Sequence, residues 1–265
     1  MSVLPTANGQ CTAKGQLMEL EGRTIIVTGA AGGIGSAIAT ACAHQGGTVI
    51  AVDRVEMPPD PSLPAEVGAR LSSYPADIST AAGCADLLTS VLAGFGVVDG
   101  LVNCAGVMRR GSLLDIDEDD WAATFAVNVD AVMHLSRGIL PSLIGAGTGS
   151  IVNIASQWGL HPAGGHIAYN TSKAAVVSFS QSLARDYGGQ GVRVNAVCPG
   201  EILTPMLKQK LETSNIAEAV LAESIPLGRL GRPDEVAELT TFLLSDRASF
   251  ISGAAIEITG AQQVG

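Results

Sequence analysis

Positive charge is scarce in this chain of 265 residues, which carries 15 lysines and arginines against 25 aspartates and glutamates. A net charge of -10 provides no basic surface for the phosphates of a nucleic acid or for an anionic membrane. The sequence also lacks a run of about 18 apolar residues that could span a bilayer, and its first twenty residues lack the pattern of a signal peptide. We therefore expect a cytoplasmic protein whose partners are small molecules, with no nucleic acid and no membrane.

Cysteines and histidines are few and poorly arranged for binding metals. The five cysteines are widely spaced, odd in number and form no CxxC pair: Cys11, Cys42, Cys84, Cys104 and Cys198. This pattern is typical of free thiols in a reducing compartment, so we expect no disulfide and no zinc. The four histidines form no HExxH motif, and we expect no metal site.

Hydrophobic residues make up 47% of the chain, and they gather in short β-branched runs that alternate with alanine-rich helical stretches. Strands are predicted at residues 23–29, 47–53, 99–105, 149–156, 191–200 and 253–259, with a weaker one at 69–77. Helices are predicted at residues 34–44, 80–93, 121–140, 168–187 and 233–244. Near-continuous apolar strands between helices indicate a parallel sheet that is covered on both faces. The predicted fold is α/β, a Rossmann-like doubly wound sheet.

The domain organisation is predicted to be simple. Residues 1–20 are interpreted as an N-terminal extension, and residues 21–265 as a single dinucleotide-binding catalytic domain. The proline cluster at residues 57–64 interrupts one crossover, so we expect a surface loop there.

A glycine-rich turn follows the first predicted strand. The stretch "TGAAGGIG" at residues 28–35 places Gly29, Gly33 and Gly35 before a helix. Such glycines let the backbone approach a pyrophosphate, whose charge is met by the amides at the helix N-terminus. The spacing departs from a strict GxGxxG, and the alternative is a turn with no ligand.

The second strand ends at Asp53, 24 residues after Gly29. A carboxylate there would accept hydrogen bonds from the adenosine ribose and repel a 2′-phosphate, which favours NAD over NADP. Arg54 follows and could serve a 2′-phosphate, but the glycine turn contains no basic residue to assist it. The alternative interpretation of Asp53 is an ordinary turn residue.

Tyrosine and lysine are rare, yet Tyr169 and Lys173 stand four positions apart at the start of a predicted helix. Residues at this spacing share one helix face, so the ammonium should lie beside the phenol ring. The simplest alternative is a surface lysine that covers a tyrosine.

With "TGAAGGIG", "NCAG" at 103–106, Asn128, Ser156 and "YNTSK" in this order, the sequence resembles the short-chain dehydrogenase/reductase family over residues 20–260. The resemblance implies a seven-stranded sheet, a nicotinamide cofactor and a homotetramer or homodimer. Two departures are visible. Cys104 replaces the second asparagine of the usual NNAG, and "ITGAQQV" replaces the usual Asp-Gly-Gly after the last strand, which puts the C-terminal tail in doubt.

The resemblance also implies roles for individual residues. Tyr169 would exchange a proton with the substrate hydroxyl, Lys173 would stabilise the phenolate and bind the nicotinamide ribose, and Ser156 would bind the substrate oxygen. Asn128 would hold a water that links Lys173 to solvent. The implied cofactor contacts are Gly29, Gly33, Ile34, Gly35, Asp53, Arg54, Asp77, Ile78, Asn103, Ala105, Gly106, Tyr169, Lys173, Pro199, Gly200, Ile202 and Thr204.

The candidate substrate residues are mostly polar: Arg109, Arg110, Gln157, Trp158, His161 and His166. Polar groups reject ligands that leave them unpaired, so this set favours a sugar or polyol over a steroid or an acyl chain. Arg109 or Arg110 would gain a role if the sugar carried a sulfonate or carboxylate; otherwise both are surface residues. The alternatives are a 3-oxoacyl carrier-protein reductase that uses NADPH, or a nucleotide-sensing protein without catalysis.

Overall fold

A parallel sheet of seven strands forms the centre of the computed structural model, which describes residues 18–214 and 217–262. The strand order is β3-β2-β1-β4-β5-β6-β7 and every pairing is parallel, which confirms the predicted doubly wound α/β fold. The strands are β1 (Thr24–Thr28), β2 (Thr48–Asp53), β3 (Leu71–Pro75), β4 (Gly100–Asn103), β5 (Gly149–Ile154), β6 (Val192–Pro199) and β7 (Ala255–Ile258). The predicted N-terminal extension lies outside the described residues, except for residues 18–20.

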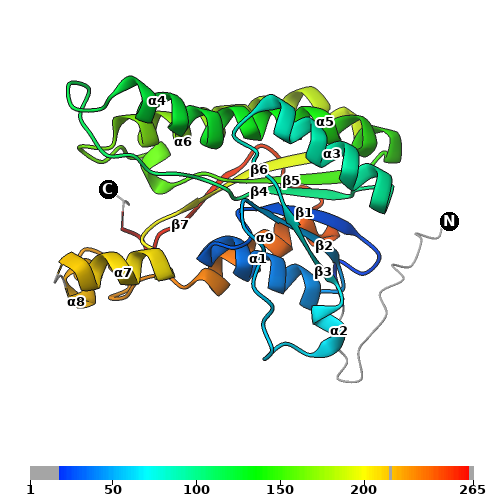
Figure 1. The fold of residues 1–265 in the computed structure, drawn as a ribbon, viewed down its shortest axis with the longest axis horizontal. Coiled ribbons are helices and arrows are strands. Elements are labelled where there is room, and N and C mark those ends of the chain that lie inside the picture. The colour runs from blue at the N-terminus through cyan, green and yellow to red at the C-terminus, as the bar shows by residue number, and fades with distance from the viewer. Residues whose placement is uncertain (1–17, 215–216, 263–265) are drawn as a thin grey trace.

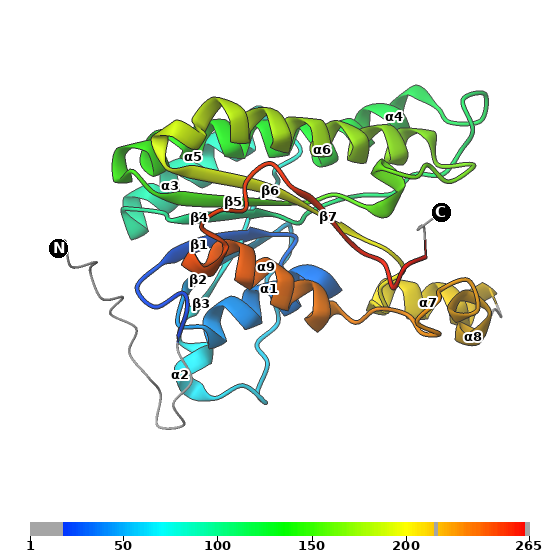
Figure 2. The same cartoon turned by 180° about the vertical axis from the view of Figure 1, so that it is seen from behind.

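Helices cover both faces of this sheet (Figures 1 and 2). They are α1 (Gly33–His44), α2 (Ala65–Gly68), α3 (Ala81–Phe95), α4 (Glu118–Phe125), α5 (Ala131–Ala146), α6 (Ile167–Tyr187), α7 (Pro205–Ser214), α8 (Glu218–Ala222) and α9 (Pro233–Leu244). Helices α1 and α9 lie on one face, and α3, α5 and α6 lie on the other. The short helices α7 and α8 extend beyond the end of β6.

Successive residues of the strands supply the two cores. On β1, Ile25 and Val27 pack toward α1 and α9, while Ile26 packs toward α3 and α5. All three are at most 1% exposed. Burial on both faces explains why the strands consist of continuous apolar residues rather than alternating ones.

The helix expected at residues 121–140 was predicted with the wrong boundaries. The chain forms α4, a single π-helical turn at Ala126–Asp130, and then α5, which continues through Pro141 to Ala146. Proline removes one backbone donor, but Ile139 and Leu143 on either side are fully buried, and their packing holds the helix together. The π turn widens the backbone at the position of Asn128.

The predicted loop at residues 57–64 contains no helix or strand, and most of its residues are exposed. Among the described residues, no helix is long and apolar enough to cross a membrane.

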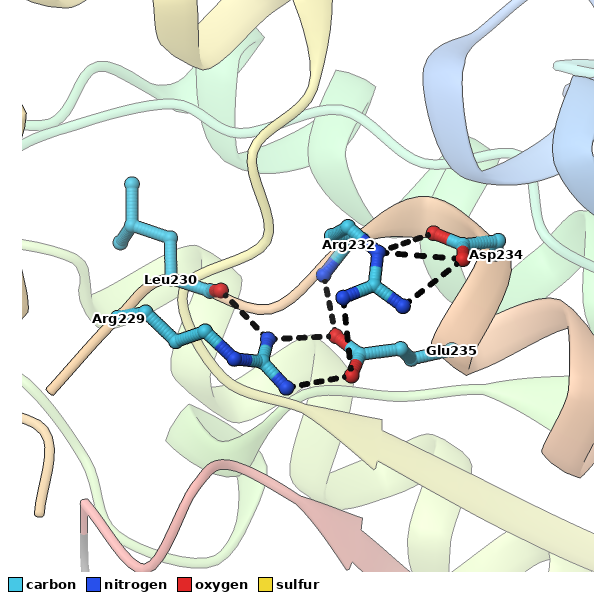
Figure 3. Close-up of polar contacts among 5 residues, drawn as sticks. All are labelled: Arg229, Leu230, Arg232, Asp234 and Glu235. Carbon is cyan, nitrogen blue, oxygen red and sulfur yellow. Dashed lines mark hydrogen bonds and ion pairs between the residues drawn. The ribbon is translucent and has the colours of Figure 1, made fainter. Parts of the chain in front are cut away.

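A network of charged side chains joins the segment after α8 to the first turn of α9 (Figure 3). Arg229 binds both carboxylate oxygens of Glu235 at 2.7 and 2.9 Å, and Glu235 also accepts a hydrogen bond from the backbone amide of Arg232 at 2.8 Å. Arg229 holds the pKa of Glu235 down at about 2. Next to this network, Gly231 pairs with Ile202 after β6, so the segment is fixed where α7 and α8 branch off the sheet.

Candidate active site

The motifs singled out in the sequence meet at the carboxyl ends of β1, β4, β5 and β6. Open α/β sheets place their ligands at this edge, next to the point where the strand order reverses. Here the reversal lies between β1 and β4.

The turn after β1 tolerates only glycine at two positions. Gly29 has a φ of +70°, and a Cβ there would lie 2.8 Å from the Ala105 backbone; a Cβ on Gly35 would lie 2.0 Å from the Gly29 carbonyl oxygen. Thr28 fixes the neighbouring strand end, because its hydroxyl accepts from the amides of Cys104 and Ala105 at 3.0 and 3.1 Å. Helix α1 has no side-chain cap, so its first amides remain available to an anion.

Asp53 lies beside this turn. One carboxylate oxygen accepts from the Ala31 amide at 3.1 Å and the other from the Arg54 amide at 2.7 Å. The Arg54 side chain is exposed. A hydrogen bond from the Ser79 amide is the main cause that lowers the pKa of the Asp77 carboxyl, and Arg54 adds to this effect. Ile78 is buried in the core on the side of α3.

Tyr169, Ser156 and Lys173 form one cluster. Ser156 at the end of β5 hydrogen-bonds the Tyr169 phenol, and the Lys173 Nζ lies 5.8 Å from the centre of the Tyr169 ring. Burial, opposed by the Ser156 hydrogen bond, raises the pKa of Tyr169 to about 12. Burial therefore disfavours the phenolate and the Ser156 hydrogen bond favours it, while its stabilisation by Lys173 stays a prediction.

Lys173 is 4% exposed, and its Nζ donates to the Ile154 carbonyl at 2.7 Å. Burial lowers the pKa of Lys173 to about 8, because an ammonium loses its hydration inside the protein. The alternative of a surface lysine is thus excluded, and the predicted i, i+4 proximity to Tyr169 is confirmed.

Asn128 in the π turn is fully buried and makes three hydrogen bonds. Its side chain accepts from the Val107 amide at 2.8 Å and donates to the Val107 carbonyl and to the Ser172 hydroxyl, both at 3.0 Å. Ser172 in turn donates to the Tyr169 carbonyl at 2.8 Å. A Cβ on Gly106 would lie 3.4 Å from both Asn128 and Lys173, so the loop after β4 passes directly over both residues.

The turn after β6 closes the other side of the site. Pro199 is buried at the end of β6, and a Cβ on Gly200 would lie 3.2 Å from the Gln157 Oε1. Ile202 is buried. A Cβ on Gly33 would lie 2.8 Å from the Pro205 side chain and 3.0 Å from the Thr204 side chain. The turn after β1 and the turn after β6 therefore face each other.

The Asn103 side chain points into the interior rather than into the site. Its Nδ2 donates to the Asn153 Oδ1 at 2.8 Å and lies 3.4 Å from the Ser136 hydroxyl. A second bond from Asn153 to Ser180 extends this buried chain of polar groups to α6. The chain joins β4, β5, α5 and α6, so it ties together the strand that precedes Ser156, the helix that follows the π turn of Asn128, and the helix that carries Tyr169.

The predicted substrate residues separate into two groups. Trp158 lies 4.6 Å from His166 and 6.1 Å from Tyr169 between ring centres, and Gln157 adjoins Ser156, so these three surround the cluster. Arg109 instead pairs with Asp120 at 2.9 Å, and His161 lies 3.3 Å from Glu257 on β7. The Arg110 side chain is exposed.

Two residues of this region, Ser172 and Gln262, were not assigned roles from the sequence, and a carboxylate, Glu201, lies close to the phenol as well. The Glu201 carboxylate is close enough to raise the pKa of Tyr169, Ser172 links Asn128 to Tyr169, and Gln262 of the C-terminal tail binds Gln157 at 3.0 Å. The only sequence signal near Gln262 was the stretch "ITGAQQV", which departs from the usual Asp-Gly-Gly. Among the described residues, no group of three or more His, Cys, Asp or Glu side chains could hold a metal ion.

Comparison with known proteins independently supports the assignment of this site to an oxidoreductase family. A family model described as enoyl-(acyl carrier protein) reductase matches residues 29–260. The chain is 38% identical to 2-keto-3-deoxy-L-fuconate dehydrogenase from Xanthomonas campestris, over 91% of this chain and 80% of that protein. It is 38% identical to D-threitol dehydrogenase from Mycolicibacterium smegmatis (91% and 93%), and 36% identical to the 3-oxoacyl-[acyl-carrier-protein] reductase of Thermotoga maritima (92% and 98%).

A solved structure agrees with these matches. The L-sorbose reductase from Gluconobacter frateurii, complexed with NADPH and L-sorbose, superposes with a TM-score of 0.88 at 30% identity, over 94% of this chain and 99% of that one. Fold and site thus define a nicotinamide-dependent oxidoreductase. The chain belongs to the short-chain dehydrogenase/reductase family.

Proposed function

We propose that this protein is an NAD-dependent dehydrogenase of a sugar or polyol, which interconverts a secondary alcohol or hemiacetal and its carbonyl form. The observation that carries the proposal is the meeting of Tyr169, Ser156 and Lys173 beside the glycine turn. The first test is to measure NAD reduction with panels of neutral sugars, polyols, sugar acids, steroids and hydroxyacyl thioesters. Turnover of steroids or thioesters alone would overturn the carbohydrate assignment.

The residues present fit a dinucleotide. Close packing at Gly29 and Gly35 leaves the backbone bare where a pyrophosphate would lie, and the uncapped amides of α1 would meet its charge. Gly33, Ile34 and Gly35 would hold the phosphates, and Asp53, Arg54, Asp77 and Ile78 the adenosine. The residues that would line the nicotinamide half are Ala105, Gly106, Pro199, Gly200, Ile202 and Thr204, with Asn103 through its backbone, since its side chain points into the interior. The bound cofactor supplies the hydride acceptor and, when oxidised, a positive charge.

The chain's own groups would manage the proton. Ser156 would hold the substrate oxygen, and Tyr169 would take the hydroxyl proton during oxidation or return it during reduction. Lys173 would bind the nicotinamide ribose and offset the charge of the phenolate. Asn128, held by Val107 and Ser172, would place the water that passes the proton to solvent.

Asp53 is proposed to select NAD. Changing Asp53 to Ala should remove hydrogen bonds to the ribose and relieve repulsion of a 2′-phosphate, because a carboxylate and a phosphate repel each other. We expect the ratio of kcat/KM for NAD to that for NADP to fall at least about 10-fold, which corresponds to 1.4 kcal/mol. Steady-state kinetics with both cofactors measures this ratio.

The exposed Glu56 provides a matched control, and E56A should leave the ratio near that of the wild type. R54A should lower use of NADP if the Arg54 guanidinium is what binds a 2′-phosphate. The similar sorbose reductase was solved with NADPH, so the wild type should also be assayed with NADP. Equal kcat/KM for NAD and NADP would reject the assignment of NAD.

The substrate is either an uncharged polyol or sugar, or a sugar acid. D-threitol dehydrogenase is named for an uncharged polyol, and the Xanthomonas relative for a sugar acid. If the substrate is anionic, Arg110 would bind it, because Arg109 already pairs with Asp120. R110A should then raise KM about 10- to 150-fold while R109A should change it less; with a neutral sugar, neither change should matter.

The second candidate is a 3-oxoacyl carrier-protein reductase, which the Thermotoga relative favours. Against this candidate, the Asp53 carboxylate beside the glycine turn would repel the 2′-phosphate of the NADPH that such a reductase is expected to use. We further propose a homotetramer or homodimer formed through the helices around residues 121–140 and 168–187.

A further inference from the structure

Hydrogen-bond acceptors without partners gather around the proposed reacting groups. Four buried side-chain atoms of the described residues lack a hydrogen-bond partner: Asn103 Oδ1, Gln157 Oε1, His166 Nε2 and Asn170 Oδ1. The last three belong to residues that follow Ser156 directly or lie within three positions of Tyr169. Burying an acceptor without a partner is unfavourable, so a cluster of such atoms indicates a ligand that donates hydrogen bonds.

The orientation of the Gln157 amide is fixed from the C-terminal tail. Ser224 donates its hydroxyl hydrogen to the Leu221 carbonyl at 2.9 Å, so toward Gln262 it can only accept. Gln262 must then present its Nε2 to Ser224 and its Oε1 to Gln157, which donates from Nε2 at 3.0 Å. In this arrangement every bond of the chain is made, and the Gln157 oxygen is left without a partner.

His166 is constrained in the same sense. Its Nδ1 lies 2.8 Å from the Gly164 carbonyl, which can only accept, so Nδ1 carries the hydrogen. In the neutral ring Nε2 is then an acceptor. Trp158 packs against the His166 ring on one side and contacts the Tyr169 ring on another. His166 and Tyr169 are therefore both neighbours of the same indole ring.

Carboxylates lie in the region of these acceptors, where the basic side chains are Lys173, which donates to the Ile154 carbonyl, the exposed Arg110, and the paired Arg109. The Gln157 oxygen lies beside Gly200, and the neighbouring Glu201 carboxylate raises the pKa of Tyr169. Arg109 is held by Asp120, and His161 lies against Glu257. An anion at this position would meet acceptors and a carboxylate, whereas hydroxyl groups would satisfy them.

We propose that the substrate is an uncharged polyhydroxylated molecule, and that one or two hydroxyls other than the reacting one donate to Gln157 Oε1 and His166 Nε2. Gln262 is then a positioning residue, because it acts by holding the Gln157 amide with its oxygen toward the substrate. This inference rests on the proposed sugar or polyol dehydrogenase activity and narrows its substrate class.

The test compares pentitols with their monodeoxy analogues and with aldonates of the same length. In the wild type, loss of the recognised hydroxyl should lower kcat/KM about 10- to 100-fold, and aldonates should be poorer substrates than pentitols. Q157M removes the acceptor at similar side-chain length, so the deoxy penalty should shrink to less than about threefold.

Two changes at position 262 separate orientation from packing. Glutamate retains an acceptor for the Gln157 Nε2, so Q262E should keep the deoxy penalty. Lysine offers only donors and should turn the Gln157 oxygen away from the site, so Q262K should lose most of the penalty. The added positive charge alone would improve aldonates without removing the penalty. Q190M, on an exposed residue after α6, serves as the surface control.

The outcomes are distinct. Equal deoxy penalties in wild type, Q157M and Q262K, or aldonates turned over better than pentitols, would overturn this inference while leaving a sugar dehydrogenase in place. Turnover of no sugar or polyol would overturn the proposed function and this inference together. If Q157M fails to fold, H166F and Q262K provide the same comparison.

Discussion

Replacing Tyr169 by phenylalanine is expected to lower kcat about 10²- to 10⁴-fold, which is the usual contribution of a positioned proton donor or acceptor. The change removes only the hydroxyl that bonds Ser156 and leaves the ring to contact Trp158. Folding should be preserved, because no buried polar group other than the Ser156 hydroxyl loses a partner. Stopped-time assays of NAD reduction at high enzyme concentration measure the residual rate.

Tyr187 at the end of the same helix provides the matched control. It lies about five turns from Tyr169 and packs against the core on the side of α3 and α5. Y187F should retain kcat within about threefold while Y169F loses it. Near-normal turnover by Y169F would show that another group handles the proton and would remove the main support for the proposed mechanism.

Replacing Lys173 by methionine should change activity and stability in opposite directions. Loss of the ammonium should lower kcat about 10²- to 10³-fold, because a positive charge no longer stabilises the phenolate. The same loss should stabilise the protein at pH 7. The pKa of Lys173 falls from 10.5 to about 8 on folding, so burial of its charged form opposes folding at neutral pH by about 3 kcal/mol at most.

The sign of the pH dependence follows from the lowered pKa. Below pH 8 the group is charged in both folded and unfolded states, and the full penalty applies. Between about pH 8 and 10.5 the folded protein releases its proton first, so wild-type stability should rise relative to K173M. We therefore expect the melting temperature of K173M to exceed that of the wild type by several degrees at pH 7 and the gap to narrow by pH 10.

Lys208 on α7 is exposed and provides the control, since K208M should change neither the melting temperature nor its pH dependence at this scale. A lower melting temperature for K173M at pH 7 would mean that the bond from Lys173 to the Ile154 carbonyl outweighs desolvation. The conclusion that burial of the Lys173 charge lowers the stability of the folded protein would then be wrong.

Features that depend on local chemistry could be predicted from the sequence. The seven strands follow from β-branched runs such as residues 47–53, and the turn at 28–35 from glycines that close backbone contacts require. The i, i+4 spacing correctly placed Lys173 beside Tyr169, because helix geometry is fixed whatever lies around it.

Features that depend on distant partners could not be predicted. The interruption at Asn128 arises where its side chain bonds the loop at Val107, 21 residues away. Gln262 binds Gln157 across 105 positions of sequence, and Arg109 pairs with Asp120 rather than remaining free for a substrate. The raised pKa of Tyr169 depends on burial and on Glu201, neither of which the Tyr-x3-Lys pattern contains.

Transfer of a label from the substrate carbon tests the central claim most directly. A pentitol that carries deuterium on its secondary carbinol carbons should be incubated with NAD and the protein, and the reduced cofactor examined by mass spectrometry. The proposed function predicts one deuterium per reduced cofactor with the wild type and, over the same time, almost none with Y169F. Reduced cofactor without deuterium, or no reduced cofactor with any sugar or polyol, would contradict it.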